Sequence, residues 1–156
     1  MTVAKFMTSP VITVTPDSSI ADLLHILKAG EISGVPVIDA NGRLAGIVSR
    51  QDIILQELRL MNGKPHAAQE IRQILSAGFV TVSDEGLKSR STPICEIMTS
   101  ASRVISCRQR TSIEEACNLL ANRHVHRLPV LAGRADELVG ILTTVDVVRA
   151  VAKGQI

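Results

Sequence analysis

The sequence predicts an α+β fold built from two tandem β-α-β-β-α repeats, and two observations carry that prediction. The first is an internal repeat: Gly34–Ile38 and Gly46–Asp52 recur as Arg127–Leu131 and Gly140–Asp146, at offsets of 93 and 94 positions. The second is that each copy places an amphipathic helix before a pair of short aliphatic runs. Since one copy cannot cover its own sheet, we expect the two copies to pack together as a pair.

Local signals place the elements of the first repeat, taken as residues 1–62. A short β-rich run ends at a proline, a serine caps an amphipathic helix, and a glycine ends that helix. Two strands joined by a hairpin turn follow, and a second helix begins after them. In chain order the predicted features are the strand Val11–Val14, the cap Ser18 or Ser19, the helix face Ile20, Leu23, Leu24 and Leu27, the stop Gly30, the strands Val35–Ile38 and Leu44–Ser49, the turn Asn41-Gly42, and a helix carrying Ile53, Ile54, Leu55 and Leu58.

The second repeat, residues 98–156, follows the same plan. Its first helix places apolar residues 93 positions after those of the first repeat. A polar loop joins its two strands, and a valine-rich helix comes last. The predicted features are the strand Val104–Ser106, a capping box at Thr111–Glu114, the helix face Ile113, Ala116, Cys117 and Leu120, the strands Leu128–Leu131 and Leu138–Thr143, and a helix carrying Val147, Val148 and Val151.

Residues 63–97 separate the repeats as an inserted helical or irregular linker, longer than a plain connection requires. Ala67, Ile71, Ile74 and Leu75 suggest a helix in it, and Gly78–Val82 suggests a short strand. The sequence assigns this insert no function.

Composition limits the classes of function. Apolar residues make up 46% of the 156, but Phe6 and Phe79 are the only aromatic ones, so base stacking on aromatic rings is disfavoured. The net charge is +2, and residues 98–156 carry +3, which suits an anionic small ligand better than a nucleic acid. Three cysteines without CxxC spacing, no signal peptide and no long apolar run predict a reduced, cytoplasmic protein without membrane insertion.

The repeated motifs resemble those of the CBS domain. Each copy has a Met-Thr opening (Met7, Met98), a helix, an aliphatic strand with a central proline, and Gly-Ile-(Val/Leu)-(Ser/Thr)-x-x-Asp before a second helix. The tandem, over residues 7–58 and 98–152, resembles a CBS pair, or Bateman module, packed with pseudo-twofold symmetry. The long insert departs from the short connection that is commonest in that family.

The resemblance implies a function as well as a fold. CBS pairs bind adenosine-containing ligands (AMP, ADP, ATP or S-adenosylmethionine) in clefts between the repeats, and regulate an enzyme or transporter. They also form disc-like homodimers. We therefore expect a non-catalytic ligand sensor with no catalytic cofactor, and we retain one alternative, a ligand-free dimerising scaffold.

Ser49, Asp52, Thr143 and Asp146 are the first candidate site residues. A carboxylate can accept both hydroxyls of a ribose, and a hydroxyl at a helix start suits a phosphate. The resemblance assigns these roles to the same positions. The spacing equally predicts helix capping, with the acid in the first turn, so both interpretations stay open.

A second group of candidates lies at the entries to the strands. The resemblance places an adenine slot there, formed mostly by backbone and aliphatic contacts, whereas ordinary core packing is the competing interpretation. These candidates are Ile12, Thr13, Ser33, Gly34, Val35, Pro36, Ile105, Ser106, His126, Arg127, Leu128 and Pro129.

Three basic residues precede the second central strand. Arg127 suits a phosphate, because its guanidinium can bond two oxygens at once, or it is a surface residue. His124 and His126 face ligand or solvent, and we expect no metal site, since three or four converging ligands are not evident. We find no nucleophile elbow, no phosphate-binding P-loop and no GxGxxG, so we expect no enzymatic activity.

Overall fold

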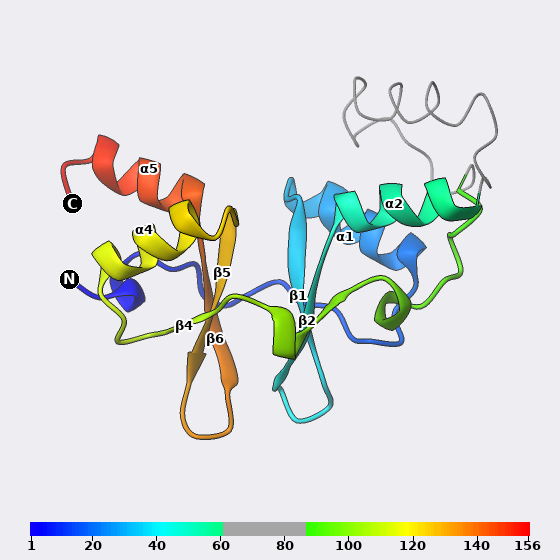
Figure 1. Cartoon of the computed structure of the whole chain (residues 1–156), viewed down its shortest axis with the longest axis horizontal. Coiled ribbons are helices and arrows are strands. Elements are labelled where there is room, and N and C mark those ends of the chain that lie inside the picture. Colours follow the sequence, from blue (N-terminus) through cyan, green and yellow to red (C-terminus); the bar gives the residue numbers. More distant parts are fainter. Residues whose placement is uncertain (61–86) are drawn as a thin grey trace. The chain divides into compact units, whose positions relative to one another are not determined.

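The computed structural model describes residues 1–60 and 87–156 (Figure 1). In this part of the chain, helices accompany two three-stranded sheets with the strand orders β1-β2-β3 and β4-β5-β6, so the predicted α+β class is confirmed. The helix and strand expected around Ala67–Leu75 and Gly78–Val82 lie outside the described residues. The elements are α1 (Ile20–Gly30), β1 (Gly34–Ile38), β2 (Leu44–Ser49), α2 (Arg50–Leu60), β3 (Thr99–Ser100), β4 (Cys107–Arg108), α4 (Ile113–Asn122), β5 (Arg127–Ala132), β6 (Glu137–Thr143) and α5 (Thr144–Ala152), with 3-10 turns at Val3–Lys5, Ile94–Glu96 and Ala101–Arg103.

Contacts divide the chain into two compact units, each with its own hydrophobic core. One unit consists of Met1–Ile12, Ile38–Leu44 and Ala101–Ile156, and the other of Thr13–Val37 and Ala45–Ser100. Most of each unit comes from one repeat. The unit of the second repeat also includes Met1–Ile12, before the first repeat's helix, and Ile38–Leu44, the turn between its two strands.

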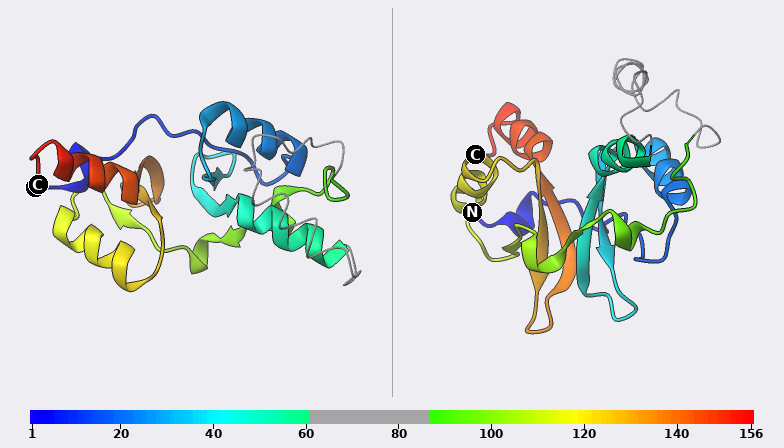
Figure 2. Two further views of the ribbon diagram at one scale, coloured as in Figure 1. Left: turned by 90° about the horizontal axis from the view of Figure 1, so that it is seen from above. Right: turned by 45° about the vertical axis from the view of Figure 1, so that its right-hand side comes forward.

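The core of the first repeat lies between α1, β1, β2 and α2, which are neighbours in the views of Figure 2. Ser19 caps α1: its hydroxyl accepts from the N–H of Asp22, and the Asp22 carboxylate accepts from the N–H of Ser19, both at 3.1 Å. Ser19 is therefore the cap, of the two serines considered. The helix ends at Gly30 as expected, but the left-handed residue is Glu31, at φ 51°.

The chain before the second repeat completes the first repeat. The N–H of Ile94 donates to Ser18 at 2.8 Å, and the N–H of Ile20 donates to Thr92 at 3.0 Å. Strand β3 then pairs antiparallel with β2, with Gly46 opposite Ser100. Ile94 is fully buried in the first core, so residues 92–100 belong structurally to the repeat that comes before them.

The N-terminal residues complete the second repeat in the same way. The N–H of Val3 donates to Thr111 at 2.9 Å, and Thr8 exchanges two backbone hydrogen bonds with Ile141, at 2.8 and 3.1 Å. Val3 is fully buried in the core that α4, β5 and β6 share. Strand β4 runs parallel to β5, β6 runs antiparallel to it, and α4 packs against β5 while α5 packs against β6 (Figure 1).

Three local predictions were wrong. Val11–Val14 is not a strand: of these four residues only Val14 bridges to β1, in parallel with Val37, and its N–H donates to the carbonyl of Pro36 at 3.2 Å. In the second repeat the strand begins at Cys107, because the N–H of Val104 turns back to Ala101.

The third correction concerns the start of α4. The cap is Ser112, whose hydroxyl accepts from the N–H of Glu115 at 3.1 Å. Thr111 instead accepts from the N–H of Arg108 at 3.0 Å. Two adjacent hydroxyl residues left the register of this cap ambiguous in the sequence.

Candidate functional site

The helices α2 and α5 begin with the same arrangement of hydroxyl and carboxylate. Asp52 Oδ2 accepts from the N–H and the hydroxyl of Ser49, at 2.8 and 3.2 Å. Asp146 Oδ2 accepts from the N–H and the hydroxyl of Thr143, at 2.9 and 2.7 Å. The capping interpretation therefore holds in both repeats. In both carboxylates it is Oδ2 that accepts these hydrogen bonds.

The second carboxylate oxygen of Asp146 meets a cation. Arg149 Nη1 donates to Asp146 Oδ1 at 3.2 Å, and the side chains are 59% and 9% exposed respectively. A pair with one partner so exposed is worth at most about 1 kcal/mol, so a ligand hydroxyl could replace it. At the matching position, 94 residues earlier, α2 carries Leu55.

A backbone hydrogen bond ties each helix start to the entry of the central strand. The N–H of Arg50 donates to Ser33 at 3.0 Å, and the N–H of Thr144 donates to His126 at 3.1 Å. These bonds place the candidates Ser33 and His126 beside their helix starts. They also engage N–H groups that a phosphate would otherwise use, so the helix starts offer an anion fewer donors than the spacing implied.

The structure brings several second-repeat candidates together. Arg127 follows His126 and lies directly opposite Thr143 in the β5–β6 ladder, and Thr143 precedes Asp146 by one turn of α5. In the first repeat, Thr13 adjoins the Val14–Pro36 hydrogen bond.

Other candidates are less clearly part of a site. The side chains of Val35 and Leu128 lie in the core, 1% and 0% exposed, so only their backbone groups could meet a ligand. The other buried candidates in the same two strands are Gly34, Pro36 and Pro129. Ile105 and Ser106 are half-buried just before β4, with Ile105 packed against the second core. Ile12 is half-exposed and belongs to the compact unit of the second repeat, unlike Thr13.

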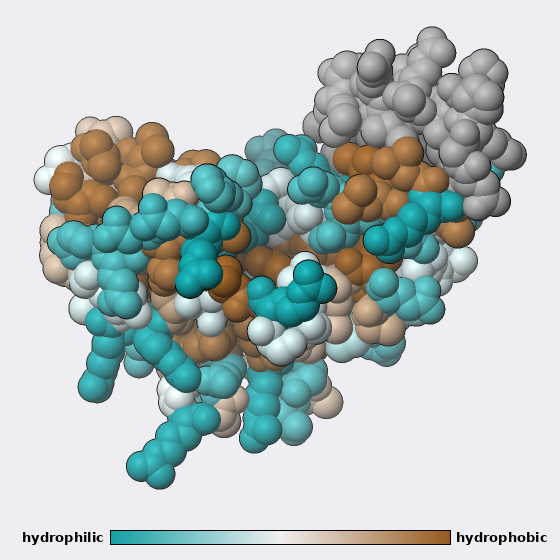
Figure 3. All heavy atoms as spheres, viewed as in Figure 1, coloured by the Kyte–Doolittle hydropathy of each residue, from teal (hydrophilic) through white to brown (hydrophobic). Residues whose placement is uncertain are grey.

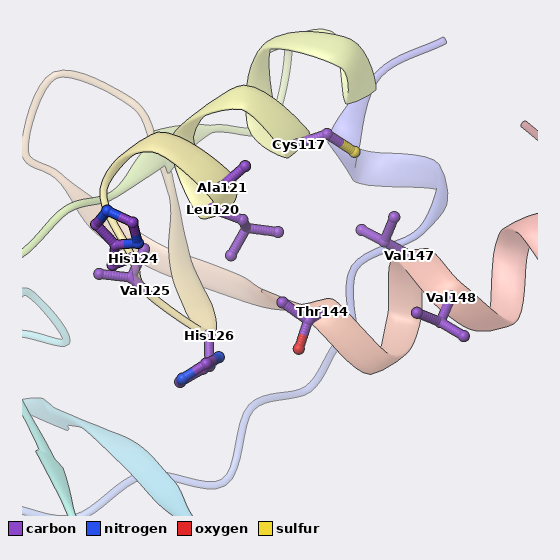
Figure 4. Close-up of a pocket in the computed structure, with 9 residues that line it drawn as sticks. All are labelled: Cys117, Leu120, Ala121, His124, Val125, His126, Thr144, Val147 and Val148. Carbon is purple, nitrogen blue, oxygen red and sulfur yellow. The ribbon is translucent and has the colours of Figure 1, made fainter.

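An apolar hollow of about 600 Å³ opens between α4 and α5, and Figure 4 shows side chains from both helices and from the turn after α4 around it. Of the predicted site residues only His126 lines this hollow, and sequence reasoning missed the rest as a group. The sequence did carry a signal for this hollow. Helix α5 has more valines than the side that packs on the core can bury, which indicates a second apolar side. The lining residues are Cys117, Leu120, Ala121, His124, Val125, His126, Thr144, Val147 and Val148.

Two cysteines of the second repeat are held as thiols, and one of them, Cys117, lines this hollow. Burial, and then the charge of Glu115, raises the pKa of Cys107 to about 11. Burial, and then the charge of Glu114, also raises the pKa of Cys117. Thiols of this kind are poor nucleophiles at neutral pH. Within residues 1–60 and 87–156, no three or more His, Cys, Asp or Glu side chains gather in a way that could hold a metal ion.

Two α-β-β-α units with matching hydroxyl–carboxylate helix starts define a tandem-repeat α+β domain. The family model of the CBS domain matches residues 3–58 and 94–153. The chain therefore belongs to the CBS domain family, and the two matched segments are its repeats. None of the helices described here has the length and apolar character needed to cross a membrane.

Named relatives share this architecture. The CBS domain-containing protein CBSX2, chloroplastic, of Arabidopsis thaliana is 32% identical over 154 residues, which cover 96% of this chain and 63% of that protein. The crystal structure of CBSX2 in complex with AMP is similar with a TM-score of 0.72, at 29% identity, covering 99% of this chain and 98% of that one. A CBS domain pair in complex with 5′-methylthioadenosine and S-adenosyl-L-methionine has a TM-score of 0.69, at 21% identity, covering 99% and 98%, a likeness of fold alone.

Proposed function

We propose that this protein is a non-catalytic regulatory module that binds an adenosine-containing nucleotide. The observation that carries the proposal is the duplicated helix start, in which Ser49 with Asp52 and Thr143 with Asp146 have the same hydrogen bonds. The similar structure of CBSX2 with AMP supports the ligand class. AMP, ADP, ATP and S-adenosylmethionine are the candidates, as regulatory ligands rather than catalytic cofactors.

Each candidate residue has a role in this proposal. Asp52 and Asp146 accept from the ribose hydroxyls. The hydroxyls of Ser49 and Thr143, which donate to these two carboxylates in the structure, turn on ligand binding to donate to phosphate. Arg127 and His126 add donors at the second site. The adenine meets the backbone and half-buried side chains at Thr13 and Ser106 and at the strand entries.

Signalling follows from differential binding. A ligand that contacts both repeats stabilises the arrangement in which both contacts form, and the equilibrium shifts toward it. A regulated enzyme or transporter would read that arrangement. We further propose that the protein is a homodimer in the cytoplasm and binds no nucleic acid.

The alternative is a dimerising scaffold whose sites stay empty. The exposed apolar surface of α5 favours it, because a surface of that kind serves association rather than ligand recognition. Ligand binding separates the two functions directly, since a scaffold needs none.

The test is calorimetry and thermal melting with AMP, ATP and S-adenosylmethionine. Asp52→Asn and Asp146→Asn should each weaken nucleotide binding about tenfold or more, because a charge-assisted bond is lost. Asp22→Asn is the matched control: it alters the same kind of cap on α1, outside the candidate site, and should leave affinity unchanged. No heat and no melting shift with any ligand at millimolar concentration would contradict nucleotide binding.

A finer test addresses the phosphates. Arg127→Ala should weaken ATP binding by about 1.5–3 kcal/mol and hardly change adenosine binding, since its fork suits phosphate oxygens. Arg50→Ala, the charge at the start of α2, should have a smaller effect. An equal loss for ATP and adenosine would remove Arg127 from the phosphate site.

A further inference from the structure

Two methionine side chains lie against glycines at matching positions of the two repeats. Met7 packs on Gly140 of β6 and Met98 packs on Gly46 of β2, and the two glycines are 94 positions apart. A methyl group on Gly140 would overlap the Sδ of Met7 and lie 2.9 Å from its Cγ, whereas a methyl group on Gly46 would lie 2.9 Å from the Sδ of Met98. Each sulfur is thus packed directly on a strand backbone that carries no side chain.

Each methionine comes just before the backbone pairing that holds its segment in place. Thr8, after Met7, exchanges two hydrogen bonds with Ile141 of β6. Thr99, after Met98, lies opposite Ile47 where β3 pairs with β2. Both methionines therefore lie where a segment from outside a repeat is attached to that repeat.

Both side chains lie at the edge of an apolar core. Met7 packs against the core of the second repeat and Met98 against that of the first, and each is only partly buried. Figure 3 shows apolar residues reaching the surface in both repeats, among polar side chains. A thioether in such a place can meet a small oxidant dissolved in water, and its packing depends on its apolar neighbours.

Met1 has neither of these properties. Its side chain is 55% exposed, and its Sδ accepts from the Nζ of Lys5 at 3.3 Å. Oxidation of this sulfur adds a polar oxygen that water already surrounds, so it should cost the fold nothing. The remaining methionine, Met61, lies outside the described residues.

We propose that Met7 and Met98 are reversible oxidation sites, at which hydrogen peroxide detaches residues 1–8 and 92–100 from the repeats that they complete. A lone pair of the sulfur attacks one peroxide oxygen, an S–O bond forms as the O–O bond breaks, a proton passes to the other oxygen, and water leaves. The sulfur loses two electrons and the peroxide gains them. The polar sulfoxide cannot remain packed on a glycine beside an apolar core, so the side chain must leave its place.

Peroxide treatment tests the sites in a Met61→Leu, Cys95→Ser background, which removes one further sulfur and the exposed thiol. Mass spectrometry should find Met1 oxidised fastest, followed by Met7 and Met98. The Tm should fall by about 5 °C or more as the sulfoxides at positions 7 and 98 form, and not as that at position 1 forms. The two methionine sulfoxide reductases, one for each epimer, should restore the Tm.

Leucine variants are the matched control, because leucine is close to methionine in volume and forms no sulfoxide. In Met7→Leu/Met98→Leu, peroxide should still oxidise Met1 but should shift the Tm by less than about 1 °C. Met7→Gln and Met98→Gln place an unbranched polar side chain at each site without an oxidant. Each should speed amide hydrogen exchange about tenfold or more in the segment that follows the substituted residue.

Four results would overturn the inference. Met7 and Met98 that stay reduced while Met1 is fully oxidised would mean that both sulfurs are inaccessible. Sulfoxides at both positions without a fall in Tm, or glutamine variants with unchanged hydrogen exchange, would mean that the fold accommodates the polar group. An equal fall in the leucine variant would assign the loss to another residue, and a Tm that the reductases do not restore would reject reversibility. None of these measurements depends on nucleotide binding.

Discussion

Helices α2 and α5 begin with one pattern and continue in different surroundings. Glu57 of α2 is 2% exposed, and its Oε1 accepts from the N–H of Ser89 at 2.7 Å and from the Ser89 hydroxyl. The position 94 residues later is Val151, which is 58% exposed. A polar residue is thus buried where its apolar counterpart faces solvent. The repeat determines how each helix starts, but the chain packed against it determines which side chains are buried.

The two repeats also differ in how tightly the Met-Thr segments pack. A methyl group on Gly46 would overlap the carbonyl oxygen of Thr99 and lie 2.9 Å from the Sδ of Met98. A methyl group on Gly140 would overlap the side chain of Met7 alone. The first contact is with fixed backbone, whereas the second is with a flexible side chain that can move away.

The largest effect should therefore come from Gly46→Ala. We expect it to lower the free energy of unfolding by about 3 kcal/mol, because β2 and β3 must separate to admit the methyl group. Gly140→Ala should cost about 1 kcal/mol, and Met7→Ala should reduce that cost when combined with it. Urea unfolding of Gly46→Ala, Gly140→Ala, Met7→Ala and the Gly140→Ala/Met7→Ala double variant measures these changes in the free energy of unfolding. Equal costs at the two glycines would show that the repeats pack alike.

Glu57 gives the second prediction. Glu57→Ala leaves the buried N–H and hydroxyl of Ser89 without their acceptor, and should lower the free energy of unfolding by about 2 kcal/mol. Val151→Ala, the matched change on α5, should stay within about 0.5 kcal/mol because the side chain is exposed. Ser89→Ala in the Glu57→Ala background separates the polar loss from the packing loss. Removal of the unpaired hydroxyl should recover part of the lost stability, and no recovery would show that the hydroxyl contributes nothing to the loss. A small loss from Glu57→Ala alone would mean that water replaces the carboxylate.

The sequence predicted the parts of the fold that depend on neighbouring residues. A serine cap on the first helix, the helix periodicity and strands β1, β2, β5 and β6 follow from local spacing, and the structure confirms them, with Ser19 chosen over Ser18. The exchange of segments could not be predicted, because sequence adjacency assigns Met7 and Met98 to the repeats that follow them. The burial of Glu57 depends on Ser89, 32 positions away, and no helical periodicity reports such a contact. At the candidate site the hydroxyl–carboxylate pairs were evident, whereas the salt bridge of Asp146 with Arg149 depends on side-chain orientation.

Arg149→Ala should have the smallest effect and addresses the difference between the two candidate ribose sites. Its loss should change the free energy of unfolding by less than about 0.5 kcal/mol, since an exposed i, i+3 pair contributes little. If the Asp146 carboxylate must leave Arg149 to accept a ribose hydroxyl, the variant should bind adenosine about two- to fivefold more tightly at that site. Leu55→Arg makes the reciprocal change in α2 and should weaken the Asp52 site by a similar factor. Calorimetry with adenosine and ATP measures the affinity of each variant for both ligands. A loss of ATP affinity larger than that of adenosine would instead make Arg149 a phosphate ligand, and unchanged binding of both would place the ribose away from Asp146.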